Sequence, residues 1–470
     1  MTATGPQDRD ETVAKQLPLE GGATPARTSK PRKRAPKKAT AKKAPRRPSS
    51  RQETDLDQGT ELERRVGRVE FAEGAFVRLR TPVRAEADPG RDVLTDIDVL
   101  SVDVDLRLHI ARSALECKSG GGQAGEPDRL FWLSGFRHYL QVERAVLVRE
   151  TTSRRGIALA RDLGLHVLDK QTLEAREAAN AWLPQEFAHI GGAACGRAET
   201  RTDTQLRAIA AIPPDLVAFL RHGALLADSH SILGALASLN GEVARAAVVP
   251  EPAGLVIAGH SLIALILASL QDAGLAETTA DEELRRRIEL ALVTGSPDDA
   301  HVLDVLSQAD EFLRTQVNRL HQAYVDEGAS RLELEFPSLR DLVSQPPAWV
   351  ERYIDFISRI RNNPTIARDI LQTAELAVFD ALVGGDAWKA EAFNHLFTPE
   401  HGSLVSSAVR LLADIVGGTL GDRLAGLRDL GFDRATPTLP ARRESGSELP
   451  NAEAATLAQE QGNEGSNGES

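Results

Sequence analysis

The residues best suited to chemistry are carboxylates and one lysine on two neighbouring apolar segments. Side chains alternate between the two faces of a strand, so Glu116 and Lys118 share one face of Ala114–Lys118. By the same alternation, Asp96 and Asp98 share one face of the preceding apolar segment. If these segments are adjacent strands, a carboxylate pair lies beside an ammonium group.

Such a group of side chains predicts metal-assisted hydrolysis. Converging carboxylate oxygens are the hard ligands that Mg²⁺, or the similar Mn²⁺, prefers. A metal held there would stabilise charge on a scissile phosphate and lower the pKa of an attacking water. Lys118 would position or polarise that water.

The elements around these residues form an α/β layer over residues 59–184. Apolar runs with strand periodicity occur at Ala75–Leu79, Ile97–Val102, Leu106–Ile110, Ala114–Lys118, Ala145–Val148 and Leu165–Leu168. Helical patterns occur at Glu61–Phe71, Arg129–Gln141 and Arg155–Leu163, with Gly164 closing the last. This alternation predicts a mixed sheet with helices packed on it.

Over residues 59–170 the sequence resembles the PD-(D/E)xK nuclease superfamily, above all its Mrr-type and resolvase-type branches. That family places an Asp at the start of a β-hairpin and a (D/E)xK triplet on the next strand. Asp98 matches the Asp, and Glu116-Cys117-Lys118 matches the triplet at a spacing that suits a hairpin. The family's proline before the Asp is absent, although Asp96 supplies a second acid two residues upstream. Asp103 and Asp105 follow in the hairpin turn, and this crowding of acids leaves the metal assignment open between Asp96 and Asp98.

The resemblance implies a restriction-endonuclease-like fold and a Mg²⁺-dependent deoxyribonuclease of restriction, defence or repair type. It implies these metal ligands: Asp98, Glu116, the main-chain carbonyl of Cys117 and, as a second candidate, Asp96. Glu63 on the first helix, or alternatively Glu61, would orient the metal or the water. Lys118 would assist the nucleophile.

The charges of the chain are segregated, which points to a nucleic acid as partner. Residues 27–51 hold twelve Lys or Arg and no acid, whereas residues 52–470 hold 42 basic and 64 acidic side chains. A basic segment without large apolar residues stays disordered and neutralises phosphates without reading sequence. The predicted DNA contacts are Lys30, Arg32, Lys33, Arg34, Lys37, Lys38, Lys42, Lys43, Arg46 and Arg47. A solubilising tail or a localisation signal is the alternative.

Residues 202–435 predict a separate all-helical domain, and residues 441–470 a polar disordered tail. Thr279–Glu282 matches a capping box, which predicts the start of a helix, and Ser296–Asp298 predicts the start of the next helix. Leu255–Leu270 is shorter than the roughly 20 residues a membrane span needs, so we expect a buried helix and no membrane association. Gly259–Ile263 begins like a hydrolase nucleophile elbow but lacks its second glycine.

Other classes of function remain open at this point. The same fold could serve as a non-catalytic DNA-binding scaffold, or the chain could be an adaptor that binds proteins through its helical domain. A homodimer is expected if both DNA strands are cut. Cys117 and Cys195 are the only cysteines, which fits a reducing cytoplasm, next to the nucleoid if the cell is bacterial.

Overall fold

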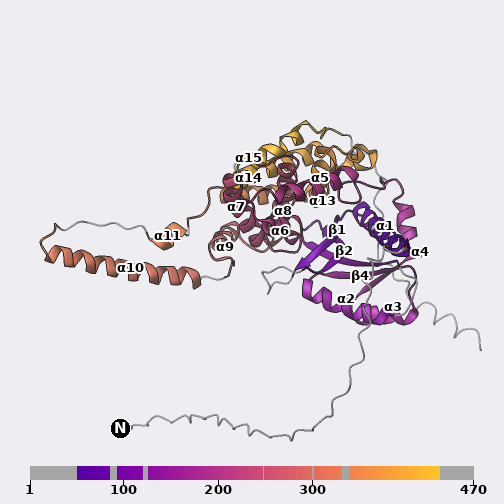
Figure 1. Ribbon diagram of the computed structural model, residues 1–470, viewed down its shortest axis with the longest axis horizontal. Coiled ribbons are helices and arrows are strands. Elements are labelled where there is room, and N and C mark those ends of the chain that lie inside the picture. The colour runs from indigo at the N-terminus through magenta and orange to yellow at the C-terminus, as the bar shows by residue number, and fades with distance from the viewer. Residues whose placement is uncertain are drawn as a thin grey trace, which may run out of the picture. The chain divides into compact units, whose positions relative to one another are not determined.

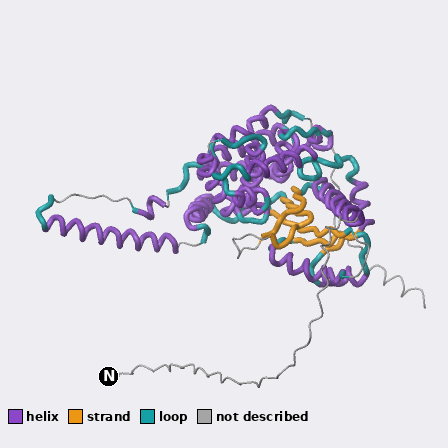
Figure 2. Tube along the Cα trace, viewed as in Figure 1, coloured by secondary structure: helices purple, strands orange, loops and turns teal. Residues whose placement is uncertain are grey.

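The computed structural model describes residues 50–84, 93–119, 125–246, 248–298, 301–330, 338–343 and 345–434. Five strands form one sheet in the N-terminal half: β1 (Phe76–Arg84), β2 (Val93–Val104), β3 (Ile110–Lys118), β4 (Arg144–Arg149) and β5 (His166–Asp169). They lie in sequence order, with β1, β2 and β3 antiparallel and β3, β4 and β5 parallel. Figure 2 shows these strands gathered together in an otherwise helical chain. The predicted mixed sheet followed by a helical region is confirmed.

Helices cover both faces of the sheet. Helices α1 (Ser50–Ala72) and α4 (Lys170–Ala179) lie on one face, and α2 (Glu126–Leu140) and α3 (Arg154–Asp162) on the other (Figure 1). Gly67 allows α1 to lie close to β1, because a Cβ at this position would come within 2.9 Å of a Leu79 methyl carbon. This close packing holds Glu63 of α1 near the strands.

A helical region completes the chain. Its α-helices are α5 (Ala193–Leu206), α6 (Pro214–Arg221), α7 (Ser229–Ala246), α8 (Ala253–Leu275), α9 (Asp281–Thr294), α10 (His301–Asp326), α11 (Leu339–Val343), α12 (Val350–Asn362), α13 (Pro364–Leu376), α14 (Pro399–Val416) and α15 (Gly418–Gly421). A π-helical turn, Ala377–Leu382, extends α13, and short 3₁₀ turns occur at Gly223–Leu225, Ala387–Lys389, Glu391–Leu396 and Asp422–Asp429.

Helix α8 is the core of this region. Among the described residues it is the one helix long and apolar enough to cross a membrane, and 94% of its most apolar window is buried within the protein. It contacts α5, α6, α7, α12, α13 and α14. The prediction that Leu255–Leu270 is a buried helix is confirmed, and the absence of a nucleophile elbow follows because Gly259–Ile263 lies inside α8.

The sheet and the helical region share one hydrophobic core. Gln372 of α13 donates hydrogen bonds to the carbonyl oxygens of Phe71 and Ala75, at 2.7 and 2.9 Å, where α1 turns into β1. Arg112 of β3 donates to the carbonyl oxygens of Leu225 and Ala227, at 2.8 and 3.1 Å. The helical region therefore holds both edges of the β1–β3 meander.

Three local predictions are wrong. Leu106–Ile110 is not a strand but the β2–β3 turn, where the Asp105 carboxylate accepts backbone hydrogen bonds and Leu108 has φ 66°. Helix α9 begins at Asp281 after Ala280, without a side-chain cap, so Thr279 does not cap it. Helix α10 begins at His301, not at Pro297. In addition, α1 already begins at Ser50, upstream of the predicted boundary at residue 59.

Candidate active site

Asp98 and Glu116 lie side by side on paired strands. Val99 of β2 pairs with Leu115 of β3, and the antiparallel register therefore sets Asp98 opposite Glu116. The backbone N–H of Cys117 donates to Asp98 Oδ2 at 2.7 Å, which fixes this carboxylate over β3. Val99 is fully buried on the opposite face, so the register cannot slip by one residue without burying the carboxylate.

Lys118 completes the group. Its Nζ lies 2.8 Å from Glu116 Oε1 and 3.6 Å from Asp98 Oδ2. The Glu116 side chain is 6% exposed and the Lys118 side chain is 37% exposed. The carboxylate is therefore enclosed by protein, whereas the lysine side chain reaches solvent. The structure thus brings together the three side chains that the sequence motif singled out.

The charges of this group are strongly coupled. Burial, and after it the Asp98 carboxylate, raises the pKa of Glu116, although the Lys118 ammonium opposes this. Burial acts to lower the pKa of Lys118, but the hydrogen bond to Glu116 and the two carboxylate charges outweigh it and raise that pKa. Lys118 is therefore an ammonium at neutral pH. It can donate hydrogen bonds and stabilise negative charge, but it cannot accept a proton.

Glu63 approaches the group from α1 and is paired with Arg80 of β1. Arg80 Nε donates to Glu63 Oε2 at 2.7 Å, and its Nη2 donates to the Thr60 hydroxyl at 2.5 Å. Burial, and then the carboxylates of Asp98 and Glu63, raises the pKa of the Cys117 thiol, so both acids lie around the same segment of β3. Glu63 is 7% exposed and is connected to this centre through Arg80.

Arg80 has an unusual backbone conformation. Its φ is 51°, in the left-handed region that costs a non-glycine residue of order 1–3 kcal/mol. The pairing of Thr81 with Ile97 and of Leu79 with Val99 sets Arg80 opposite Asp98. The strained residue therefore places a guanidinium between Glu63 and the strand that carries Asp98.

The sequence motif missed two arginines at this centre. Besides Arg80, Arg129 of α2 approaches Glu116, with Nη1 3.5 Å from Oε1. The Arg129 guanidinium carbon lies 5.5 Å from the ring centre of Trp132, which is itself partly exposed. The motif names acids and a lysine only. Arg80 could have been found from its strand position opposite Asp98, whereas Arg129 requires the packing of α2 on the sheet.

The other predicted site residues are placed as follows. Asp96 is exposed on β2 opposite Pro82, and Glu61 is exposed on α1. Cys117 is 5% exposed and pairs with Val148 of β4, and a metal-ligand role for its carbonyl stays a prediction. The predicted DNA contacts lie outside the described residues: Lys30, Arg32, Lys33, Arg34, Lys37, Lys38, Lys42, Lys43, Arg46 and Arg47.

The donor set fits a hard divalent cation. Asp98 and Glu116 offer carboxylate oxygens on adjacent strands, with Glu63 as a third acid nearby. Burial is the largest cause of the raised pKa of Glu116 and the Asp98 carboxylate adds to it, and a divalent cation between the two carboxylates would counter both effects. Oxygen ligands of this kind favour Mg²⁺ or Mn²⁺ over softer metals.

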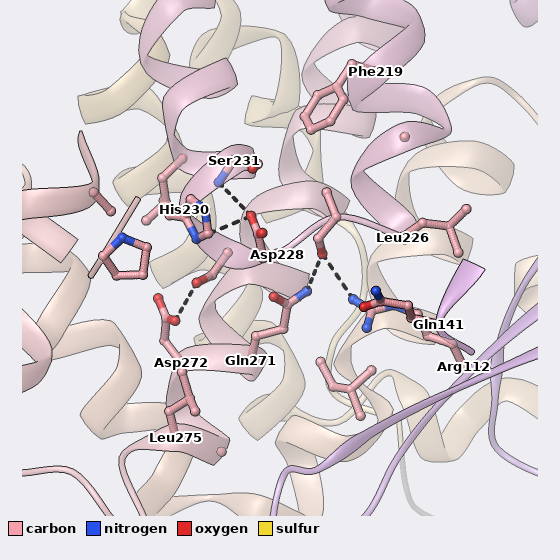
Figure 3. Close-up of a pocket in the computed structure, with 18 of the residues that line it drawn as sticks. Arg112, Gln141, Phe219, Leu226, Asp228, His230, Ser231, Gln271, Asp272 and Leu275 are labelled. Atoms are coloured by element: carbon pink, nitrogen blue, oxygen red, sulfur yellow. Dashed lines mark hydrogen bonds and ion pairs between the residues drawn. The ribbon is translucent and has the colours of Figure 1, made fainter. Parts of the chain in front are cut away.

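A large cavity in the described part of the chain lies elsewhere. It has a volume of about 1350 Å³ and is lined by the β1–β3 edge and by α6, α7, α8 and α9 (Figure 3). Several of its polar side chains bind each other or the backbone: Gln271 donates to the Ala227 carbonyl, and Ser229 donates to Asp272 at 2.6 Å. These groups hold helices together and do not converge on a shared point, so the carboxylate centre remains the better candidate.

Comparisons with protein-family models, with curated proteins and with solved structures find no match to this chain.

Proposed function

We propose that the chain is a metal-dependent deoxyribonuclease whose sheet has the restriction-endonuclease-like fold and which acts in the cytoplasm. One observation carries the proposal: Lys118 Nζ lies 2.8 Å from Glu116 and 3.6 Å from Asp98, and the three residues form an acid-acid-lysine group on two paired strands. The order of α1, three antiparallel strands, α2 and a parallel β4 agrees with the fold that the motif implies.

Asp98 and Glu116 would hold Mg²⁺ or Mn²⁺, and Glu63 would orient the ion or a water. When bound, the ion would supply positive charge to the scissile phosphate and acidify a water. In the hydrolysis, the water oxygen would bond to phosphorus while the bond to the leaving sugar oxygen breaks. The attacking water would release one proton to solvent, and the leaving oxygen would take up one proton from solvent. Because Lys118 is already an ammonium, it would orient the water and stabilise the phosphorane charge, not act as the base.

Two arginines extend this centre toward a phosphate backbone. Arg129 is 44% exposed beside Glu116, and Arg80 is 53% exposed beside Glu63. Their guanidinium groups can bind phosphate oxygens through paired hydrogen bonds. Each arginine would thus orient an acidic side chain of the centre and also bind the DNA backbone.

A non-catalytic DNA-binding scaffold is the second candidate, and one observation favours it. Lys118 and Arg129 pair with Asp98 and Glu116, and Arg80 pairs with Glu63. Three cations thus balance three carboxylates without a metal. In this alternative the ion pairs hold β1, β2, β3 and α1 together, and the basic N-terminal segment provides the affinity for DNA.

Cleavage assays separate the two candidates. Supercoiled, linear, single-stranded and branched DNA are incubated with the full-length protein in Mg²⁺ or Mn²⁺. Asp98→Asn keeps the shape of the side chain and its acceptor for the Cys117 N–H, but removes the charge. We expect cleavage to be lost in Asp98→Asn and to fall about 10²–10³-fold in Lys118→Met, because one preorganised donor is removed.

The matched control is Lys389→Met, which removes an exposed lysine from an ion pair away from the sheet. It should cleave like the wild type. Absence of cleavage of every substrate, together with salt-sensitive DNA binding by wild type and Asp98→Asn alike, would support the scaffold and reject the nuclease.

A further inference from the structure

A second group of ionisable side chains, one buried and two half-buried, lies in the helical region. His189 precedes α5, Glu199 lies on α5 and His260 lies on α8. Glu199 Oε1 is 3.1 Å from His189 Nε2 and 2.7 Å from His260 Nε2. One ligand atom from each of the three residues lies within 4.8 Å of the other two. Two imidazole nitrogens and one carboxylate oxygen thus converge on one point.

The surroundings fix all three ligands. His189 Nδ1 lies 2.7 Å from Glu375 Oε1, the carboxylate contact that orients metal-binding histidines. Arg221 Nη2 lies 2.8 Å from Glu199 Oε2, which turns Oε1 toward the imidazoles. The ring of Phe379 lies 4.5 Å from the His189 ring and 4.6 Å from the His260 ring, between centroids.

The hydrogen-bond pattern favours positive charge at this point, on protons or on a metal ion. His189 has a carboxylate oxygen beside each ring nitrogen, so without a metal both nitrogens must carry protons. The same Glu199 oxygen faces the Nε2 atom of His260, which is 1% exposed. A metal ion would take the place of the protons on both Nε2 atoms while the His189–Glu375 hydrogen bond is kept.

We propose that His189, Glu199 and His260 form a binding site for a divalent first-row transition metal, with Zn²⁺ as the fitting ion. Two imidazoles and a carboxylate suit Zn²⁺ and do not suit Mg²⁺, which prefers oxygen ligands. The site joins the segment before α5, α5 itself and α8, so a bound ion would hold these elements together. It is separate from the carboxylate centre of the sheet and does not depend on the proposed nuclease activity.

Metal content tests this proposal. Untagged full-length protein carrying Asp98→Ala is treated with chelator and titrated with Zn²⁺, so that the carboxylate centre does not contribute. We expect one Zn²⁺ per chain, at least about 100-fold weaker binding in Glu199→Gln and His260→Asn, and unchanged binding in the control His166→Gln, an exposed histidine. Glu199→Gln keeps the side-chain volume, and circular dichroism verifies its fold.

Cobalt provides a second readout that needs no variant. Co²⁺ added to the same Asp98→Ala protein should give the visible absorption bands of a nitrogen-coordinated ion, and Zn²⁺ should displace them. The proposal would be overturned if the Asp98→Ala protein neither bound one equivalent of Zn²⁺ nor developed the Co²⁺ bands. It would also be overturned if Glu199→Gln bound Zn²⁺ as tightly as the protein without that change. The cluster would then be a hydrogen-bonded charge network only.

Discussion

The buried ion pair between Arg78 of β1 and Glu375 of α13 provides a quantitative test of how the helical region holds the sheet. Arg78 Nη1 lies 2.5 Å from Glu375 Oε2, and each side chain is 3% exposed. The guanidinium carbon also lies 4.6 Å from the ring centre of Phe76 and 5.3 Å from that of Phe379. We consider the substitution Arg78→Met, which keeps an apolar side chain of similar length between these rings.

The expected loss follows from burial. Removing one partner of a buried ion pair leaves an uncompensated charge and costs about 3–5 kcal/mol. Glu375 retains hydrogen bonds from the backbone N–H and the imidazole of His189, at 3.2 and 2.7 Å, so the lower end of this range applies. We therefore expect Arg78→Met to lower the free energy of unfolding by about 3 kcal/mol.

Urea unfolding followed by circular dichroism measures this loss. The control is Arg285→Met, which breaks an ion pair with Glu351 whose side chains are 41% and 64% exposed and which should cost at most about 1 kcal/mol. The double variant Arg78→Met/Glu375→Gln removes the isolated carboxylate and should recover part of the stability. If Arg78→Met lost no more than Arg285→Met, the pair would not hold β1 against α13 and the reasoning would fail.

Two further predictions concern pH and salt. Burial lowers the pKa of His401 to about 4, below its ordinary value of 6.5, so the unfolded chain binds more protons between these values. The contribution of His401 to stability is therefore fully present above pH 6.5, and the free energy of unfolding falls by about 2 kcal/mol between pH 7.5 and pH 5. Urea unfolding at the two pH values should show this fall in the wild type and not in His401→Gln. An equal fall in both proteins would contradict the prediction. Replacing the basic residues of 27–47 by glutamine should flatten the salt dependence of DNA affinity, measured by fluorescence anisotropy in EDTA. If six phosphate contacts are lost, the slope of the logarithm of the binding constant against the logarithm of the salt concentration falls in magnitude by about 5. An unchanged slope would show that the segment does not bind DNA.

The sequence predicts the geometry of the candidate site where the alternation of side chains along a strand determines which residues share a face. Ile97 and Val99 alternate with Asp98, and Glu116 alternates with the buried Cys117, so one register places the acids together. The same reasoning failed at Leu106–Ile110, although its apolar residues alternate with Arg107 and His109. There the Asp105 carboxylate accepts the backbone N–H groups of the turn, and this local competition ends the strand.

The cluster in the helical region could not be predicted from sequence. His189, Glu199 and His260 have no motif spacing, and only the packing of α5 against α8 brings them together. Arg78 illustrates the same limit, because an arginine in an apolar strand is expected to reach solvent. Its burial depends on a partner, Glu375, that lies 297 residues later in the chain.

These contacts form one continuous path from the sheet to the centre of the helical region. Arg78 of β1 pairs with Glu375, Glu375 with His189, and His189 with Glu199 beside His260. Two residues beyond Arg78 on β1, Arg80 holds Glu63 at the carboxylate centre. Since β1 is fixed at Arg78 by charges from the helices, the strained backbone of Arg80 can persist. The helical region therefore acts, through β1, as a support for the candidate active site.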